Sequence, residues 1–284
     1  IAGSMVLWAE PPYRVTSPPK SVVKTFRLSS FYKKGLMVGG FPVLGSDKVS
    51  DFAVAEAGYI VDKMLAGRED VRQALIKNRI RLAIMAYDER TTQIPEHSDL
   101  TPAKYWDRRA RGLGATKERP AVSAAEENLL EFWGDPYKGE NILVHEFAHA
   151  IHLMGLNTLD AGFQAKLEQT YQSALKKELW KGTYAATNAE EYWAEGVQSY
   201  FDCNQQPNHD NNGVDTREKL EKYDPDLYAL IATEFRRNAW RYIHPSLRTD
   251  KAHLQGYQPD KSPRFQWGPE LNTWYKNYKK THKE

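Results

Sequence analysis

The sequence contains a single cysteine, Cys203, among 284 residues. An intrachain disulfide, a cysteine-ligated zinc finger and an iron–sulfur cluster are therefore excluded, because each needs at least two thiols. Cys203 has no activating pattern near it in the sequence, so we expect a buried, unreactive thiol rather than a nucleophile. Any catalytic chemistry must come from other side chains.

The sequence also lacks an excess of either charge and a long apolar run. The 39 Lys and Arg residues nearly balance the 37 Asp and Glu residues, which leaves a net charge of +2. This balance does not favour a nucleic-acid partner. No stretch approaches the roughly 18 apolar residues that a membrane span needs. With 41% hydrophobic residues, we expect a globular protein without a membrane span, and a monomer.

We find no internal repeat and no low-complexity linker, so the sequence favours one domain with additions at both ends. Residues 1–5 are typical of a cloning remnant, and we expect that a natural leader was removed when it was introduced. Residues 6–49, with a loop-like, glycine-rich stretch at 35–45, are expected to form an extended segment packed on the domain. The main domain, which would carry any catalytic site, is assigned to residues 50–245. Residues 246–284 are expected to form an irregular extension that prolines interrupt.

Apolar spacing and capping residues predict helices in the domain. Ser50, Asn141 and Asn188 are placed as caps for three of them. The predicted helices cover residues 51–66, 69–78, 142–154, 160–180, 189–201 and 225–242. One buried strand is predicted at 80–87, while 88–114 is expected to be a long loop that is functional or partly structured.

His145-Glu146-Phe147-Ala148-His149 matches the pattern H-E-x-x-H. On a helix the two histidines lie one turn apart on the same face, where both imidazoles can bind one zinc ion. Glu146 beside them is placed to take a proton from a zinc-bound water. An ordinary helix with two satisfied histidines is the alternative. The predicted helix, its apolar flanks and a carboxylate-rich helix downstream favour a zinc site.

A catalytic zinc ion usually has three protein ligands and one water. His152 lies about 4.5 Å beyond His149 along the helix axis, so we expect it to be packed or to support the ligands indirectly. The better candidates are the carboxylates of the helix at 189–201. Glu191 and Glu195 are one turn apart and repel each other unless a cation lies between them. Glu190 points about 100° away from Glu191 around the helix axis. The helix dipole alone is enough to explain an acidic residue at this position in the first turn.

Two sequence blocks, residues 145–150 and 184–195, resemble the catalytic domain of the anthrax lethal factor family. That family carries H-E-F-G-H-A, followed by a Tyr-x-x-Thr-Asn-x-x-Glu string with two aromatics, Ala and Glu. The similarity extends weakly to residues 80–96. Ala148 replaces the family's glycine, and the toxin's other domains have no counterpart here.

The resemblance implies an α+β, zincin-like metallopeptidase domain with a small sheet, an active-site helix and a helical C-terminal lobe. It implies one Zn²⁺ per chain, Glu146 as the general base and Tyr184 as the residue that stabilises the oxyanion. Glu195 would orient a ligand histidine. The implied zinc ligands are His145, His149 and Glu191.

The sequence therefore predicts a zinc metalloendopeptidase of the gluzincin type, acting on a peptide or protein substrate and secreted or otherwise extracytoplasmic. One alternative is a zinc hydrolase of a non-peptide amide or ester, whose site would look the same. The other is a zincin-shaped binding module with little catalysis. Glu146 argues against the last, because a purely structural site needs no base.

Two charged segments each have two interpretations. Arg108-Arg109-Ala110-Arg111 could bind an acidic group of a substrate, or it could be solvated loop charge. The basic end at 276–283, with Trp274 nearby, is better explained as a solvated terminus than as a grip for an anionic polymer. The glycines at 112 and 114 do not form a phosphate loop, since no such motif surrounds them.

Overall fold

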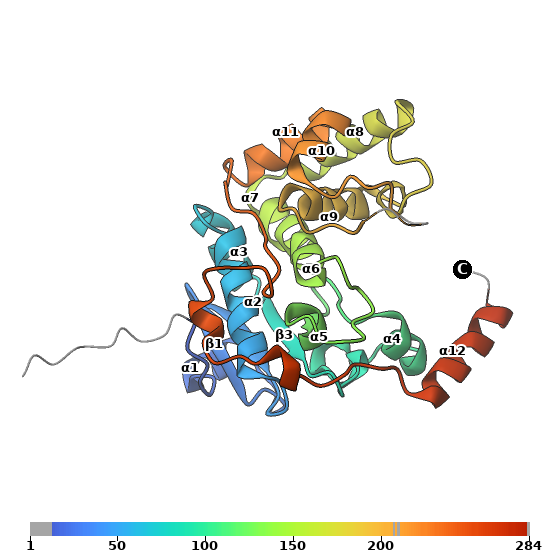
Figure 1. Ribbon diagram of the computed structural model, residues 1–284. Helices are drawn as coiled ribbons and strands as arrows, with labels where there is room; N and C mark the ends of the chain where they lie inside the picture. The colour runs from blue at the N-terminus through green and yellow to red at the C-terminus, as the bar shows by residue number, and fades with distance from the viewer. Residues whose placement is uncertain (1–12, 207, 209–210, 283–284) are drawn as a thin grey trace, which may run out of the picture.

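The computed structural model describes residues 13–206, 208 and 211–282, so the predicted remnant at 1–5 lies outside the described residues. A four-stranded sheet forms one side of the molecule, with its strands in the order β1-β2-β3-β4 (Figure 1). The first pair is antiparallel and the other two pairs are parallel. The strands are β1 (Lys34–Val38), β2 (Phe41–Gly45), β3 (Arg81–Met85) and β4 (Ala121–Ala125).

The strand predicted at 80–87 is confirmed as β3, which is buried on both faces. The loop-like interpretation of residues 35–45 is wrong, because this segment forms the β1–β2 hairpin. Its turn consists of Gly39 and Gly40, with φ of +55° and +87°. Two consecutive residues with positive φ make a hairpin turn that matches strand twist, so the glycines mark a turn between strands.

Helices cover one face of the sheet. Side chains of Leu82 and Ile84 point to that face and join the main core, whereas Ala83 and Met85 point to a smaller core on the other face. This alternation follows from the two-residue period of a strand. Against the main core pack α2 (Asp51–Met64), α3 (Glu69–Lys77) and α6 (Ile142–Ala150).

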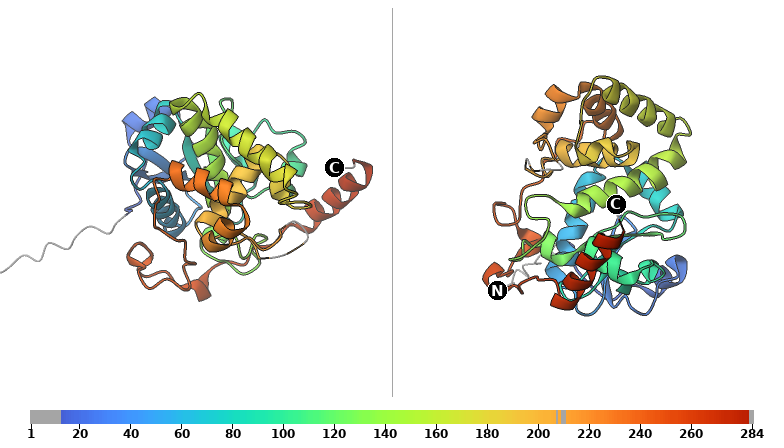
Figure 2. Two further views of the ribbon diagram at one scale, coloured as in Figure 1. Left: turned by 90° about the horizontal axis from the view of Figure 1, so that it is seen from above. Right: turned by 90° about the vertical axis from the view of Figure 1, so that its right-hand side faces the viewer.

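A second group of helices packs on the far side of α6 and forms a C-terminal lobe (Figures 1 and 2). Helix α6 thus lies between this lobe and the sheet. The predicted α+β class is confirmed, with its small sheet, its motif-bearing helix and its helical C-terminal lobe. The helices of the lobe are α8 (Phe163–Lys176), α9 (Ala189–Tyr200), α10 (Arg217–Tyr223) and α11 (Pro225–Glu234).

The predicted helix starts are confirmed by their caps. Ser50 accepts a hydrogen bond from the Phe52 amide at 3.3 Å, and Asn141 accepts one from Val144 at 3.1 Å. Asn188 caps α9 in the same way. Such side chains satisfy amide groups that have no partner inside the helix.

The ends of three predicted helices are wrong. The helix predicted at 160–180 is the shorter α8, which ends at Lys176. Gly155 does not stop the motif helix, which continues through a π-helical segment (Ile151–Leu156) into α7 (Asn157–Leu159). A Cβ at Gly155 would lie 2.8 Å from Val71 Cγ1, so the glycine allows α3 to pack closely. The helix predicted to reach residue 242 ends at Glu234, followed by two positive-φ arginines at 236 and 237.

The segment at 88–114 is partly structured, as expected. It contains two short 3₁₀ turns, Thr91–Gln93 and Pro95–His97, and helix α4 (Ala103–Arg109). The remaining short elements are α1 (Lys20–Phe26), α5 (Glu126–Leu129) and the 3₁₀ turns η4 (Tyr184–Ala186), η5 (Ala252–Leu254) and η6 (Pro259–Lys261). None of the helices in the described part of the chain has the length and apolar character of a membrane span.

The C-terminal extension is more ordered than predicted. It ends in helix α12 (Pro269–Thr281), which extends from the body beside α4 (Figure 1). Arg248 forms a two-pronged ion pair with the buried carboxylate of Glu56 on α2, at 2.7 and 2.8 Å. His253 approaches the same carboxylate at 2.6 Å. These contacts fix the extension to the sheet-side helices.

Candidate metal centre

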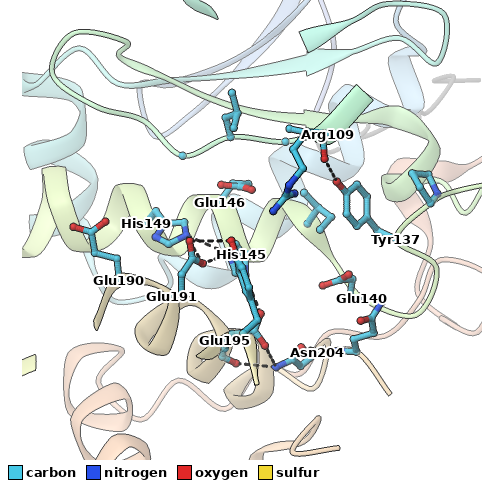
Figure 3. A pocket seen from close by; sticks show the side chains of 18 of the residues that line it. Arg109, Tyr137, Glu140, His145, Glu146, His149, Glu190, Glu191, Glu195 and Asn204 are labelled. Atoms are coloured by element: carbon cyan, nitrogen blue, oxygen red, sulfur yellow. Dashed lines mark hydrogen bonds and ion pairs between the residues drawn. The ribbon is translucent and has the colours of Figure 1, made fainter. Parts of the chain in front are cut away.

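Helices α6 and α9 pack side by side and carry the predicted ligands. The indole nitrogen of Trp193 on α9 donates to the carbonyl oxygen of Ala148 on α6 at 3.0 Å. This contact aligns the two helices, so that His145 and His149 face Glu191 (Figure 3).

Three side-chain atoms form a compact triangle. The Nε2 atom of His145 lies 3.0 Å from Oε2 of Glu191 and 3.2 Å from Nε2 of His149. The third edge, from His149 to Glu191, is 3.4 Å. Ligand atoms on a tetrahedral zinc ion at 2.0–2.2 Å are roughly 3.3 Å apart, which matches these edges. Within the described residues, His145, His149 and Glu191 form a group that could hold a metal ion.

Gln198, a residue that the sequence did not single out, fixes the orientation of His145. Its Oε1 lies 2.8 Å from Nδ1 of His145, and its Nε2 donates to the Asn141 carbonyl oxygen at 3.2 Å. Because the amide nitrogen is committed to Asn141, Oε1 accepts the hydrogen of Nδ1. With Nδ1 carrying this hydrogen, a bound metal could displace the hydrogen on Nε2 and take up its lone pair within the triangle.

Glu195 lies in the layer behind the triangle. Its Oε1 is 3.6 Å from Nδ1 of His145, beyond hydrogen-bond range, while its Oε2 accepts from Asn204 at 3.0 Å. Gln198 thus takes the direct bond to His145. Glu190 is exposed and lines the same cleft.

The charges around the triangle of His145, His149 and Glu191 favour a bound cation or protonated histidines. Burial lowers the pKa of His145, but the hydrogen bond to Glu191 and nearby carboxylates outweigh it and raise this pKa to about 10. Burial raises the pKa of Glu191, but both histidines reverse this and hold it below its usual range. Burial raises the pKa of Glu140 to about 7. Such a concentration of carboxylates around two imidazoles stabilises a cation.

Tyr184 lies at the edge of the triangle, in the turn that precedes α9. Its hydroxyl donates to Oε1 of Glu191 at 3.2 Å, so the two oxygens of Glu191 face different partners. The side chain is 37% exposed, which leaves it accessible from the cleft. Burial and the Glu191 charge raise the pKa of Tyr184, so its hydroxyl keeps its proton at neutral pH.

Glu146 points into the cleft from α6 (Figure 3). A glycine-rich segment passes close above it, with Leu113 paired to Ser123 of β4. A Cβ at Gly112 would lie 2.5 Å from Ile142 Cγ2, and one at Gly114 would lie 2.9 Å from His149 Cβ. These glycines therefore permit close approach to the motif helix.

The triangle opens into a cleft of about 630 Å³. One wall comes from α4, with Tyr105, Trp106 and Arg109, and the opposite wall from α9, with Glu190 and Glu195. A cavity of this size accommodates a short segment of substrate.

The remaining candidates lie away from the triangle. His152 is buried, with Nε2 2.7 Å from Oε1 of Gln164, and burial lowers its pKa to about 4. It is a packed, neutral histidine. Cys203 is buried and burial raises the pKa of its thiol, which agrees with an unreactive role.

Neither the protein-family models nor the curated proteins gave a match. The chain is similar to the solved structure of the PRO-PRO endopeptidase (PPEP-2) from Paenibacillus alvei, with a TM-score of 0.37 and 15% identity. The match covers 66% of this chain and 93% of that one. The resemblance to the lethal factor family stays a prediction.

Proposed function

We propose that this protein is a zinc-dependent hydrolase, and that it is a metallopeptidase that cleaves internal peptide bonds. The observation that carries the proposal is the triangle of His145, His149 and Glu191, with Glu146 beside it on the same helix. The resemblance between residues 184–195 and the lethal factor family also supports a zinc metallopeptidase.

The donor set fits zinc. Two imidazoles and one carboxylate are ligands that zinc accepts, and three protein ligands leave one position for water. One zinc ion per chain is implied. When bound, zinc would polarise a substrate carbonyl and make a water molecule acidic enough to ionise near neutral pH.

The chain's own residues supply the proton transfers. Glu146 would accept a proton from the attacking water and pass it to the leaving amine. Its position in the cleft, one residue after His145, allows both steps from one carboxylate. A binding module would not need this base.

Tyr184 would donate its hydroxyl hydrogen to the oxyanion that forms during attack. The contact with Glu191 keeps the hydroxyl beside the triangle, and its exposure lets it turn to a bound substrate. Such a donor acts mainly in the transition state.

Digestion of an unbiased peptide library by the zinc-loaded protein, read by mass spectrometry, tests the proposal. We expect cleavage at internal bonds that stops when a chelator removes the metal. Intact peptides throughout, with turnover of a non-peptide amide or ester, would instead support the alternative hydrolase. Location outside the cytoplasm stays a prediction, which fractionation of the source cells would test.

A further inference from the structure

The arginines of the segment 108–111 have three different surroundings. Arg108 donates to Asn272 of α12 at 2.6 Å and stacks over Trp267. Arg111 is 1% exposed and forms an ion pair with Glu127 at 2.5 Å. Both are therefore structural.

Arg109 is different, because it lines the cleft. It is the last residue of α4, and its side chain extends from the cleft wall toward α6 (Figure 3). Its backbone carbonyl oxygen accepts a hydrogen bond from the Tyr137 hydroxyl at 3.2 Å, which holds the backbone from which the side chain extends. In the described part of the chain, Arg109 has no carboxylate partner, and no other arginine or lysine lines the cleft.

The charge of Arg109 reaches the reacting end of the cleft. Its side chain points toward Glu146 on α6 (Figure 3), and Glu146 and Tyr184 line the same cleft as Arg109. The acidic residues Glu190 and Glu195 line the α9 wall instead. The two walls thus differ in charge, and a substrate anion would be attracted to the α4 wall.

The α4 wall is held from behind. The ring of Tyr105 packs against Tyr275 and Tyr278 of α12, with ring centroids 5.9 and 5.5 Å away. Arg108 adds its hydrogen bond to α12 on the same side. A binding group on a braced helix loses less freedom when it engages a ligand.

We infer that Arg109 binds a carboxylate of the substrate, so that the preferred substrates carry an anionic group close to the bond that is cleaved. This inference depends on the proposed peptidase function. The planar guanidinium can pair with a carboxylate through two parallel hydrogen bonds, and such charged bonds are strong. The carboxylate could belong to an acidic side chain or to the free C-terminus of a peptide.

Two matched substrate pairs separate these sources. In one pair, Glu in the peptide is replaced by Gln; in the other, a free C-terminus is replaced by an amide. We expect the wild-type protein to prefer the carboxylate form of one pair, and Arg109→Gln to reduce that preference, as a ratio of kcat/KM, about 10- to 100-fold. Arg109→Lys should retain part of it.

Lys104→Gln is the matched control. Lys104 lies on the same helix and is exposed, but it does not line the cleft. Its substitution removes one positive charge from α4 and should leave the preference unchanged. An equal loss in Lys104→Gln would show that only the overall charge of α4 matters, against a specific contact.

Two results would overturn the inference. One is a wild-type protein without preference in either pair. The other is an equal fall for both members of a pair in Arg109→Gln, which would show that Arg109 supports Glu146 or the oxyanion. Calorimetry can measure the affinity of zinc-loaded Glu146→Gln for the same peptides, with and without Arg109→Gln. Because this variant should not turn the peptides over, the difference in affinity reports the contact with Arg109 alone. Failure of the peptidase proposal alone would leave that binding preference intact.

Discussion

The Nε2 atom of His145 lies 3.0 Å from Oε2 of Glu191, although 46 residues separate them in the chain. The packing of α6 against α9 brings the two side chains together. Zinc affinity should therefore depend on Glu191 as strongly as on the two histidines.

Glu191→Ala should remove most of the zinc, because it deletes one of three protein ligands. Glu195→Ala and Gln198→Ala should weaken zinc affinity only about 10- to 100-fold, since neither touches the metal position directly. Metal content after dialysis, and competition with a chelator, measure these differences. Retention of full zinc affinity in Glu191→Ala would contradict the ligand assignment.

Tyr184→Phe should retain zinc and lower kcat, with KM little changed. The lost hydroxyl would act mainly on the oxyanion of the transition state. Steady-state kinetics on a substrate found by the library digest would separate the two constants. A change confined to KM would point to a substrate-contact or packing role.

Gly114→Ala should displace His149, because the added Cβ would lie 2.9 Å from the Cβ of that histidine. We expect weaker zinc binding and a stability loss of about 1–3 kcal/mol, as for other overpacked sites. The matched control is Gly268→Ala, where a Cβ meets nothing within 4 Å and φ is −59°. Equal zinc affinity in both variants would show that the segment can move away.

Asp135 should make stability depend on pH. Burial raises its pKa from 3.8 to about 6, so the folded protein holds a proton that the unfolded chain releases. The free energy of unfolding should thus fall as pH rises from about 4 to 6. Asp135→Asn, which keeps the side-chain shape, should flatten this slope. Urea unfolding at several pH values measures it, and identical slopes would refute the assignment.

Local signals made part of this structure predictable. The caps at Ser50 and Asn141, the buried strand and the H-E-x-x-H helix depend on residues close together in the chain. The small residues of β4 give no strand signal, and the glycines of the β1–β2 turn favour a loop in the sequence pattern. The roles of Gln198, Gly114 and Arg109 depend on contacts between distant segments, which one sequence does not reveal.

Glu146 is the proposed base of the zinc site, and Glu146→Gln tests this role most directly. The variant should keep one zinc ion per chain, because the substituted side chain is not among the three ligands. Its hydrolysis should fall 10²-fold or more, the scale expected when a general base is lost. Near-normal hydrolysis by the zinc-loaded variant would contradict the mechanism proposed for this cleft.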